Sequence, residues 1–226
     1  MPEGVPVRRT VRLVPFAAAT LLLAACNPHT VTGTSSPSGA AAPPARTTTG
    51  GPAQTGGGPI PLGPGPQATY RVQPQPAAGS CHYRYEQGEP LPDTACTPGA
   101  RNPAVTQATI KTTICRSGYT ATIRPPASIT GAEKKLSEKA YGTASSPSVT
   151  EYDHLLSLED GGDPNDPRNL WPEPPDPGHT HGINNLKDPV ETKLKTAVCD
   201  GKVTLAAAQQ ALVQDWTTAL DRLGLE

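Results

Sequence analysis

The sequence predicts a small α+β domain that is held together by disulfide bonds and contains a β-hairpin, a helix behind it and a C-terminal helix. Residue runs with strand propensity occur in the middle of the chain, whereas its last 40 or so residues carry apolar side chains at helical spacing. Four of the five cysteines lie between residues 81 and 199, within the part of the chain that contains these runs. The chain has 226 residues, but 28 Pro and 22 Gly indicate that much of it cannot pack into a core.

The first 25 residues are typical of an export signal. Three arginines precede an apolar run, 13–23, that is too short to span a membrane. Leu23-Ala24-Ala25-Cys26 resembles the bacterial lipobox, which is cleaved before a cysteine that then carries lipid. The resemblance makes Cys26 the lipidation site and anchors the exported protein to the outer face of the cell membrane. An ordinary cleaved signal, which would leave a secreted protein, is the alternative.

Residues 26–79 consist mainly of Pro, Gly, Ala, Ser and Thr, which predicts a disordered tether. Such a chain has a reach on the order of 40 Å. We expect the folded part to begin near Ser80. It should comprise a cysteine-containing scaffold, 80–147, and a hairpin with two helices, 148–226.

Four cysteines remain once Cys26 is set aside, and an even number in an exported chain indicates disulfide bonds. Three pairings are possible. We favour Cys81 with Cys96, which closes a short loop, and Cys115 with Cys199, which ties an early strand to the end of a late helix. The absence of a close Cys-x-x-Cys pair argues against a structural zinc site.

The scaffold should contain a second hairpin and a helix. Residues 110–115 and 119–124 favour strands and are separated by Arg116-Ser117-Gly118, which is typical of a turn. Helices are expected over 130–142, 188–200 and 204–224. Thr130 and Glu133 would form a capping box, and Asp188 would cap the second helix. Trp216 should lie in the core on the third.

A motif of polar residues lies in the second half of the chain. Tyr152-Asp153-His154-Leu155 precedes Asn169-Leu170-Trp171-Pro172, and the intervening residues 159–166 are turn formers without a large apolar side chain. This pattern predicts a strand, a loop and a second strand. Neutral His154 can take a proton from water, Asp153 can bind a divalent cation, and Asn169 can hydrogen-bond across the loop.

This arrangement resembles the HNH, or His-Me finger, endonucleases, in which a β-hairpin and a helix form a metal-dependent nuclease site. The resemblance covers roughly residues 148–216. It implies that His154 activates water, that Asp153 binds the metal and that Asn169 orients the hairpin. The implied reaction is hydrolysis of phosphodiester bonds in nucleic acid.

The family takes a second metal ligand from the helix behind the hairpin, where this chain has several prolines. Asn185 is the favoured candidate and, with Asp153, would suit Mg²⁺. Asn184 is an alternative, whereas His181, or less favourably His179, would suit Mn²⁺ or Zn²⁺. A helix that starts after Asp188 leaves Asn185 in front of it.

Charge limits the strength of nucleic-acid binding. Residues 150–226 carry 14 acidic and 6 basic side chains, whereas residues 81–140 carry 8 basic and 5 acidic ones. Nucleic acid should therefore bind weakly, without sequence preference, across the basic segment. A second function class fits the same sequence, namely an inactive cell-envelope lipoprotein that serves as an interaction module. No feature indicates an oligomer, so we expect a monomer.

Overall fold

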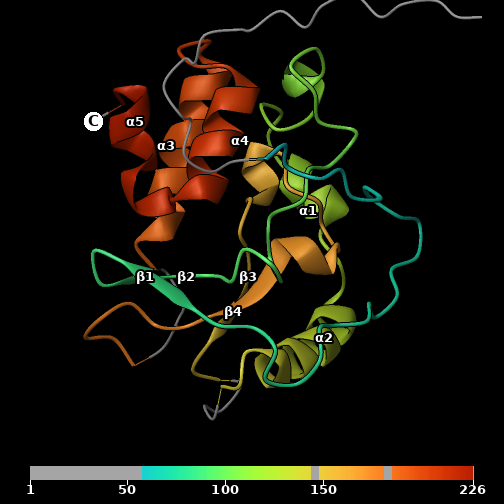
Figure 1. Ribbon diagram of the computed structural model, residues 1–226. Helices are drawn as coiled ribbons and strands as arrows, with labels where there is room; N and C mark the ends of the chain where they lie inside the picture. The colour runs from blue at the N-terminus through green and yellow to red at the C-terminus, as the bar shows by residue number, and fades with distance from the viewer. Residues whose placement is uncertain (1–57, 144–147, 181–184, 226) are drawn as a thin grey trace, which may run out of the picture. The chain divides into compact units, whose positions relative to one another are not determined.

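The computed structural model describes residues 58–143, 148–180 and 185–225. Within them the chain is a mixed helix and strand protein with five α-helices and two antiparallel two-stranded sheets (Figure 1). The strands are β1 (Arg84–Glu86), β2 (Glu89–Leu91), β3 (Glu151–His154) and β4 (Leu170–Glu173). The α-helices are α1 (Tyr119–Ile123), α2 (Ala127–Ala140), α3 (Lys187–Cys199), α4 (Leu205–Gln214) and α5 (Ala219–Leu223). The 3-10 helices are η1 (Ile110–Thr112), η2 (Leu158–Asp160), η3 (Pro167–Asn169) and η4 (Trp216–Thr218).

Both favoured disulfide bonds are confirmed. Cys81 pairs with Cys96 at an S–S distance of 2.05 Å, and Cys115 pairs with Cys199 at 1.98 Å. The second bond joins the segment after η1 to the last residue of α3. The signal segment and Cys26 lie outside the described residues.

The predicted strand, loop and strand unit is present as β3 and β4, which pair antiparallel with His154 opposite Leu170. Two leucines that follow β3 enter different hydrophobic clusters. Leu155 packs with Trp171 beside α2, whereas Leu156 packs with the C-terminal helices. Neighbouring residues in an extended segment point to opposite sides, which explains this division. Figure 1 shows the β3–β4 hairpin between α2 and the helices α3, α4 and α5.

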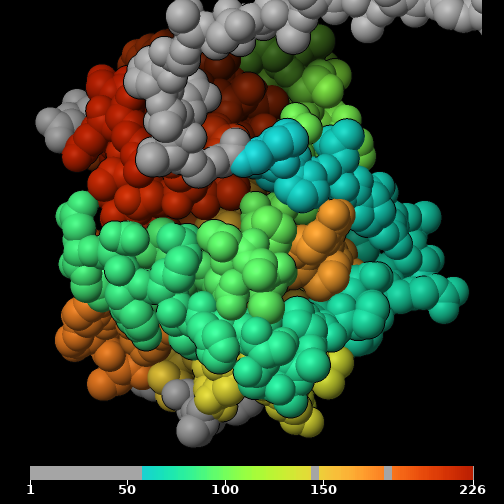
Figure 2. Space-filling view, in the orientation of Figure 1, coloured from blue at the N-terminus to red at the C-terminus, as the bar shows by residue number. Residues whose placement is uncertain are grey.

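The folded body begins by Gly58, well before the expected start at Ser80. Ile60 is buried, and Arg101 exchanges backbone hydrogen bonds with the segment 61–63. Further along, the hydroxyl of Tyr70 donates to the carbonyl of Ile123 at 2.6 Å. Figure 2 shows this segment in cyan on the surface of the body. Residues 58–79, expected as part of the tether, are therefore part of the folded body; residues 26–57 lie outside the described residues.

The hairpin expected over 110–124 is wrong. Residues 110–112 form η1 and residues 119–123 form α1. Thr109 and Thr113 stabilise the first turn, because the hydroxyl of Thr113 donates to the carbonyl of Thr109 at 2.7 Å. Ile110, Ile114 and Ile123 are buried together in the larger cluster, so tertiary packing outweighs the strand propensity of these residues.

Two predicted helix starts need correction. Helix α2 starts at Ala127, and Glu133 accepts a hydrogen bond from the backbone N–H of Gln73 instead of closing a capping box. Helix α3 starts at Lys187, its N-cap residue Leu186 has no side-chain cap, and Asp188 lies in the first turn. The predicted ends near Gly142 and Asp200 agree with the structure.

The continuous helix expected over 204–224 is also wrong. It is divided into α4, η4 and α5 at Asp215, whose backbone is extended at φ −169°. The Asp215 carboxylate accepts hydrogen bonds from the backbone N–H and hydroxyl of Thr217 and from the hydroxyl of Thr218. Trp216 is buried, as predicted, and its indole N–H donates to the carbonyl of Pro90 at 3.1 Å.

Candidate functional site

His154 ends β3, and only 7% of its surface is exposed. Its Nε2 lies 3.1 Å from the carbonyl oxygen of Pro164. A carbonyl can only accept, so Nε2 carries the hydrogen and Nδ1 keeps a lone pair. Burial lowers the pKa of His154 to about 4, against the opposite effect of the Asp153 charge. The imidazole is therefore neutral at physiological pH, and Nδ1 is the atom that can take a proton.

Asn169 fastens the loop between β3 and β4, as expected from the sequence. It is fully buried at the end of η3, directly before β4. Its Oδ1 accepts from the backbone N–H groups of Leu156 and Ala100, at 3.0 and 3.2 Å. Its Nδ2 donates to the carbonyls of Leu156 and Asp163, at 2.9 and 3.0 Å. All four bonds go to backbone, so Asn169 fixes the shape of the loop that holds His154.

The loop itself is buried although its residues are polar. Asp163 accepts hydrogen bonds from the backbone N–H groups of Gly65, Asn165 and Asp166. Gly162 lies so close to the loop that an added Cβ would be 1.7 Å from the carbonyl oxygen of Leu156. The acidic side chains thus replace water around backbone groups, which explains how a sequence of turn formers can be packed inside.

Asp153 is adjacent to His154 in sequence, and its carboxylate is paired with Lys187. The Nζ of Lys187 lies 2.6 Å from Oδ2 of Asp153, and the indole N–H of Trp171 lies 3.3 Å from the same oxygen. Lys187 also donates to the carbonyl of His154 at 3.0 Å and to the carboxylate of Glu191. The lysine side chain is fully buried.

Sequence reasoning missed Lys187, Glu191 and Glu173 as members of this site. Glu173 lies opposite Glu151 in the antiparallel register, at the end of the hairpin. Neither of its buried carboxyl oxygens has a hydrogen-bond partner among the described residues. Burial, and next the charge of Asp153, raise the pKa of Glu173 well above its ordinary value. The spacing of four residues between Lys187 and Glu191 was a visible signal of a helical ion pair.

The candidate second metal ligands are only partly described. Asn185 is buried, and its Oδ1 accepts from the backbone N–H of Lys187 at 3.1 Å, while its Nδ2 has no partner among the described residues. His179 is exposed and lies beside Asp176, with Nδ1 3.8 Å from that carboxylate. His181 and Asn184 lie outside the described residues.

The described residues do not fit a divalent metal as they are arranged. Oδ2 of Asp153 already accepts from an ammonium and an indole, and the oxygen of Asn185 is used by a backbone N–H. Within residues 58–143, 148–180 and 185–225, no three His, Cys, Asp or Glu side chains are grouped so that they could hold a metal ion. The predicted Mg²⁺ site stays a prediction, because Asn184, the alternative ligand for Mg²⁺, lies outside the described residues, as does His181, the candidate for Mn²⁺ or Zn²⁺.

Arg124 is an exposed cation whose charge acts on His154. It follows α1, is open to solvent, and its charge helps to lower the pKa of His154. A side chain whose field reaches the imidazole can also reach an anion bound beside it. Arg124 belongs to the basic segment 81–140, across which the sequence predicts that nucleic acid binds.

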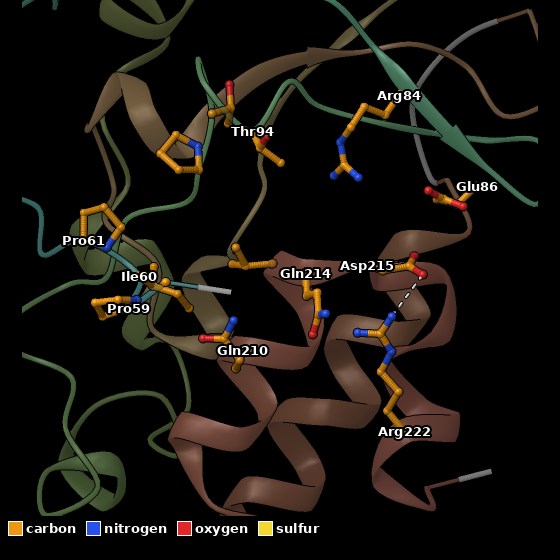
Figure 3. A pocket seen from close by; sticks show the side chains of 14 residues that line it. Pro59, Ile60, Pro61, Arg84, Glu86, Thr94, Gln210, Gln214, Asp215 and Arg222 are labelled. Atoms are coloured by element: carbon orange, nitrogen blue, oxygen red, sulfur yellow. Dashed lines mark ion pairs between the residues drawn. The ribbon is translucent and has the colours of Figure 1, made fainter. Parts of the chain in front are cut away.

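A cavity of about 720 Å³ lies elsewhere, between the start of the described chain, β1 and the C-terminal helices. Figure 3 shows Arg84 and Glu86 on one side and Asp215 and Arg222 on the other, with the last two forming an ion pair at 3.5 Å. Two acidic and two basic side chains line it, and neither His154 nor Asp153 does. It is therefore separate from the candidate site.

Comparison of this chain with protein-family models, with curated proteins and with solved structures found no match. The assignment of a function therefore depends on the geometry of the site and on the resemblance of its sequence motif.

Proposed function

We propose that this chain hydrolyses phosphodiester bonds in nucleic acid, with His154 as the base that activates water. The observation that carries the proposal is the hairpin of β3 and β4, closed by Asn169 and followed by α3, which holds His154 neutral with one ring nitrogen on a carbonyl. A hairpin followed by a helix is what the resemblance to the HNH endonucleases leads us to expect, and it supports the proposal.

In this proposal Nδ1 of His154 takes the proton of a water molecule, whose oxygen then attacks the phosphorus. The P–O bond to the leaving sugar oxygen breaks, that oxygen takes a proton from solvent water, and the imidazolium returns its proton to solvent. The Nε2–H bond to Pro164 holds the imidazole in the required tautomer during this step. Arg124 binds the phosphate and stabilises the negative charge that develops on it. In the resembled family a divalent metal polarises the phosphate, whereas the described residues of this chain, as they are arranged, do not fit one.

We also propose that the enzyme acts outside the cell, as a monomer tethered through lipid on Cys26. Two disulfide bonds agree with an oxidising compartment. No helix among the described residues is long and apolar enough to cross a bilayer. The tether would hold the active body away from the membrane surface.

The test is nicking of supercoiled plasmid by the purified chain, with and without Mg²⁺ or Mn²⁺. His154→Ala should lower the rate by roughly 10² to 10⁴, the usual contribution of a general base. His82→Ala is the matched control, because His82 is exposed and far from the hairpin in sequence. Cleavage that survives His154→Ala would remove this mechanism.

The buried state of the site supports a second candidate, the inactive interaction module. His154 has little exposed surface, and the charge of Asp153 is neutralised by a buried lysine. Cooperative unfolding of the wild-type chain would show that it is folded. If that folded chain cleaves neither DNA nor RNA under any of these conditions, the second function is favoured.

A further inference from the structure

The ammonium of Lys187 has a complete set of partners. Its three N–H groups are matched by three acceptors: the carboxylate of Asp153, the carbonyl of His154 and the carboxylate of Glu191. The side chain is fully buried, so water does not compete for these bonds. A buried ammonium persists only where such partners compensate for lost hydration.

The geometry accounts for the charge of the side chain. The three acceptors are matched by three hydrogens on Nζ, which only the ammonium form carries. The site therefore contains a positive charge that belongs to the chain itself.

We infer that the ammonium of Lys187 replaces the divalent ion that the HNH resemblance assigns to Asp153, so that Asp153 binds no metal in the native protein. The inference about metal binding is independent of catalysis; its extension, that cleavage proceeds without a divalent ion, rests on the proposed function. Lys187 acts as a positioning residue: it fixes Asp153 and the backbone of His154 and balances their field.

A metal ion and the ammonium of Lys187 cannot share one carboxylate oxygen, because they would overlap and repel each other. A Mg²⁺ ion would have to lie about 2.1 Å from Oδ2 of Asp153, where the ammonium already lies at 2.6 Å. If Mg²⁺ displaced Lys187 from Asp153, the buried ammonium would lose one of its two carboxylate partners. The favoured second ligand, Asn185, is in addition used by the start of α3.

Terbium luminescence provides a direct test, because Tb³⁺ binds oxygen sites and is sensitised by a nearby indole. The indole N–H of Trp171 lies 3.3 Å from Asp153, so an ion bound there would emit strongly when Trp171 is excited. We expect the wild-type chain to show no saturable emission that depends on Asp153, so the wild type and Asp153→Asn should give the same signal. We also expect melting temperatures in EDTA and in Mg²⁺ or Mn²⁺ to agree within about 1 °C.

Lys187→Met is the informative variant, since it removes the charge and keeps most of the volume. Its melting temperature should fall by roughly 10 °C, because three acceptors lose their cation. Mn²⁺ should recover part of that loss, and Tb³⁺ emission should appear. Should the variant not fold, the wild-type measurements still decide the question.

Two results would overturn the inference: saturable wild-type emission that Asp153→Asn abolishes, or a wild-type melting temperature that EDTA lowers and Mn²⁺ restores. Cleavage separates the inference from the proposed function. Cleavage in EDTA that His154→Ala removes supports both. Cleavage that depends on His154 and stops in EDTA contradicts the inference alone, and a folded chain that never cleaves contradicts the function alone.

Discussion

The four hydrogen bonds of Asn169 make Asn169→Ala the most direct test of how the site is held. The substitution leaves two backbone N–H groups, of Leu156 and Ala100, and two carbonyls, of Leu156 and Asp163, without their partner. All lie in the interior, because Asn169, Leu156, Ala100 and Asp163 are buried. Water cannot replace the lost amide without opening the loop.

The magnitude follows from the number of bonds. A buried hydrogen bond contributes about 1 kcal/mol net, so four bonds correspond to about 4 kcal/mol of unfolding free energy. For a body of this size, 1 kcal/mol shifts the melting temperature by roughly 2–4 °C, which gives roughly 8–16 °C. A loss of about 4 kcal/mol is a large fraction of the roughly 5–15 kcal/mol by which domains are usually stable.

Asn185→Ala is the matched control for this measurement. Asn185 is also a buried asparagine, but it makes one hydrogen bond, to the backbone N–H of Lys187. Its loss should cost about 1 kcal/mol, or roughly 2–4 °C. Both variants are compared by thermal unfolding, and amide hydrogen exchange should accelerate at Leu156 and Ala100 only in the Asn169 variant. If the two variants melt within about 2 °C of each other, the claim that Asn169 fastens the loop is refuted.

Two further predictions concern the same loop. Gly162→Ala should abolish or severely reduce folding, since its Cβ would meet the carbonyl of Leu156. By contrast, Gly131→Ala, at an exposed position of α2 with open space around it, should raise stability by about 0.5–1 kcal/mol in urea unfolding. Burial raises the pKa of Asp160 to about 8, so its protonated form stabilises the fold at low pH and that contribution is lost between about pH 4 and pH 8. Relative to Asp160→Asn, the wild type should lose about 1.4 kcal/mol per pH unit in urea titrations from pH 5 to 7.5, and equal slopes in the two proteins would contradict this assignment.

Local signals explain why part of the fold could be predicted. The β3–β4 pair is bounded by turn-forming residues, and its polar motif lies at a fixed spacing, so both strands were recognisable. The disulfide bonds were predictable because four cysteines allow only three pairings. Each of these features is decided by residues that are visible together in the sequence.

Long-range contacts decided the remainder. The segment 58–79 has a composition typical of a tether, yet Gly65 donates to Asp163 and Tyr70 to Ile123, contacts that span 98 and 53 positions. Residues 110–112 and 119–123 have strand-forming side chains but become helical where their isoleucines enter the larger cluster. Composition and propensity do not contain this information, because it depends on which surface the segment meets.

Lys187 illustrates the same limit inside the site. In the sequence, a lysine four residues before a glutamate is typical of an exposed helical ion pair of little energetic weight. In the structure this pair is buried at the start of α3, because the hairpin places Asp153 and the carbonyl of His154 over the first turn of the helix. Lys187, which belongs to an ordinary surface motif in the sequence, thereby holds Asp153 and the backbone of His154 in place. Whether Asp153 binds a metal is consequently decided by Lys187 and not by Asp153 itself.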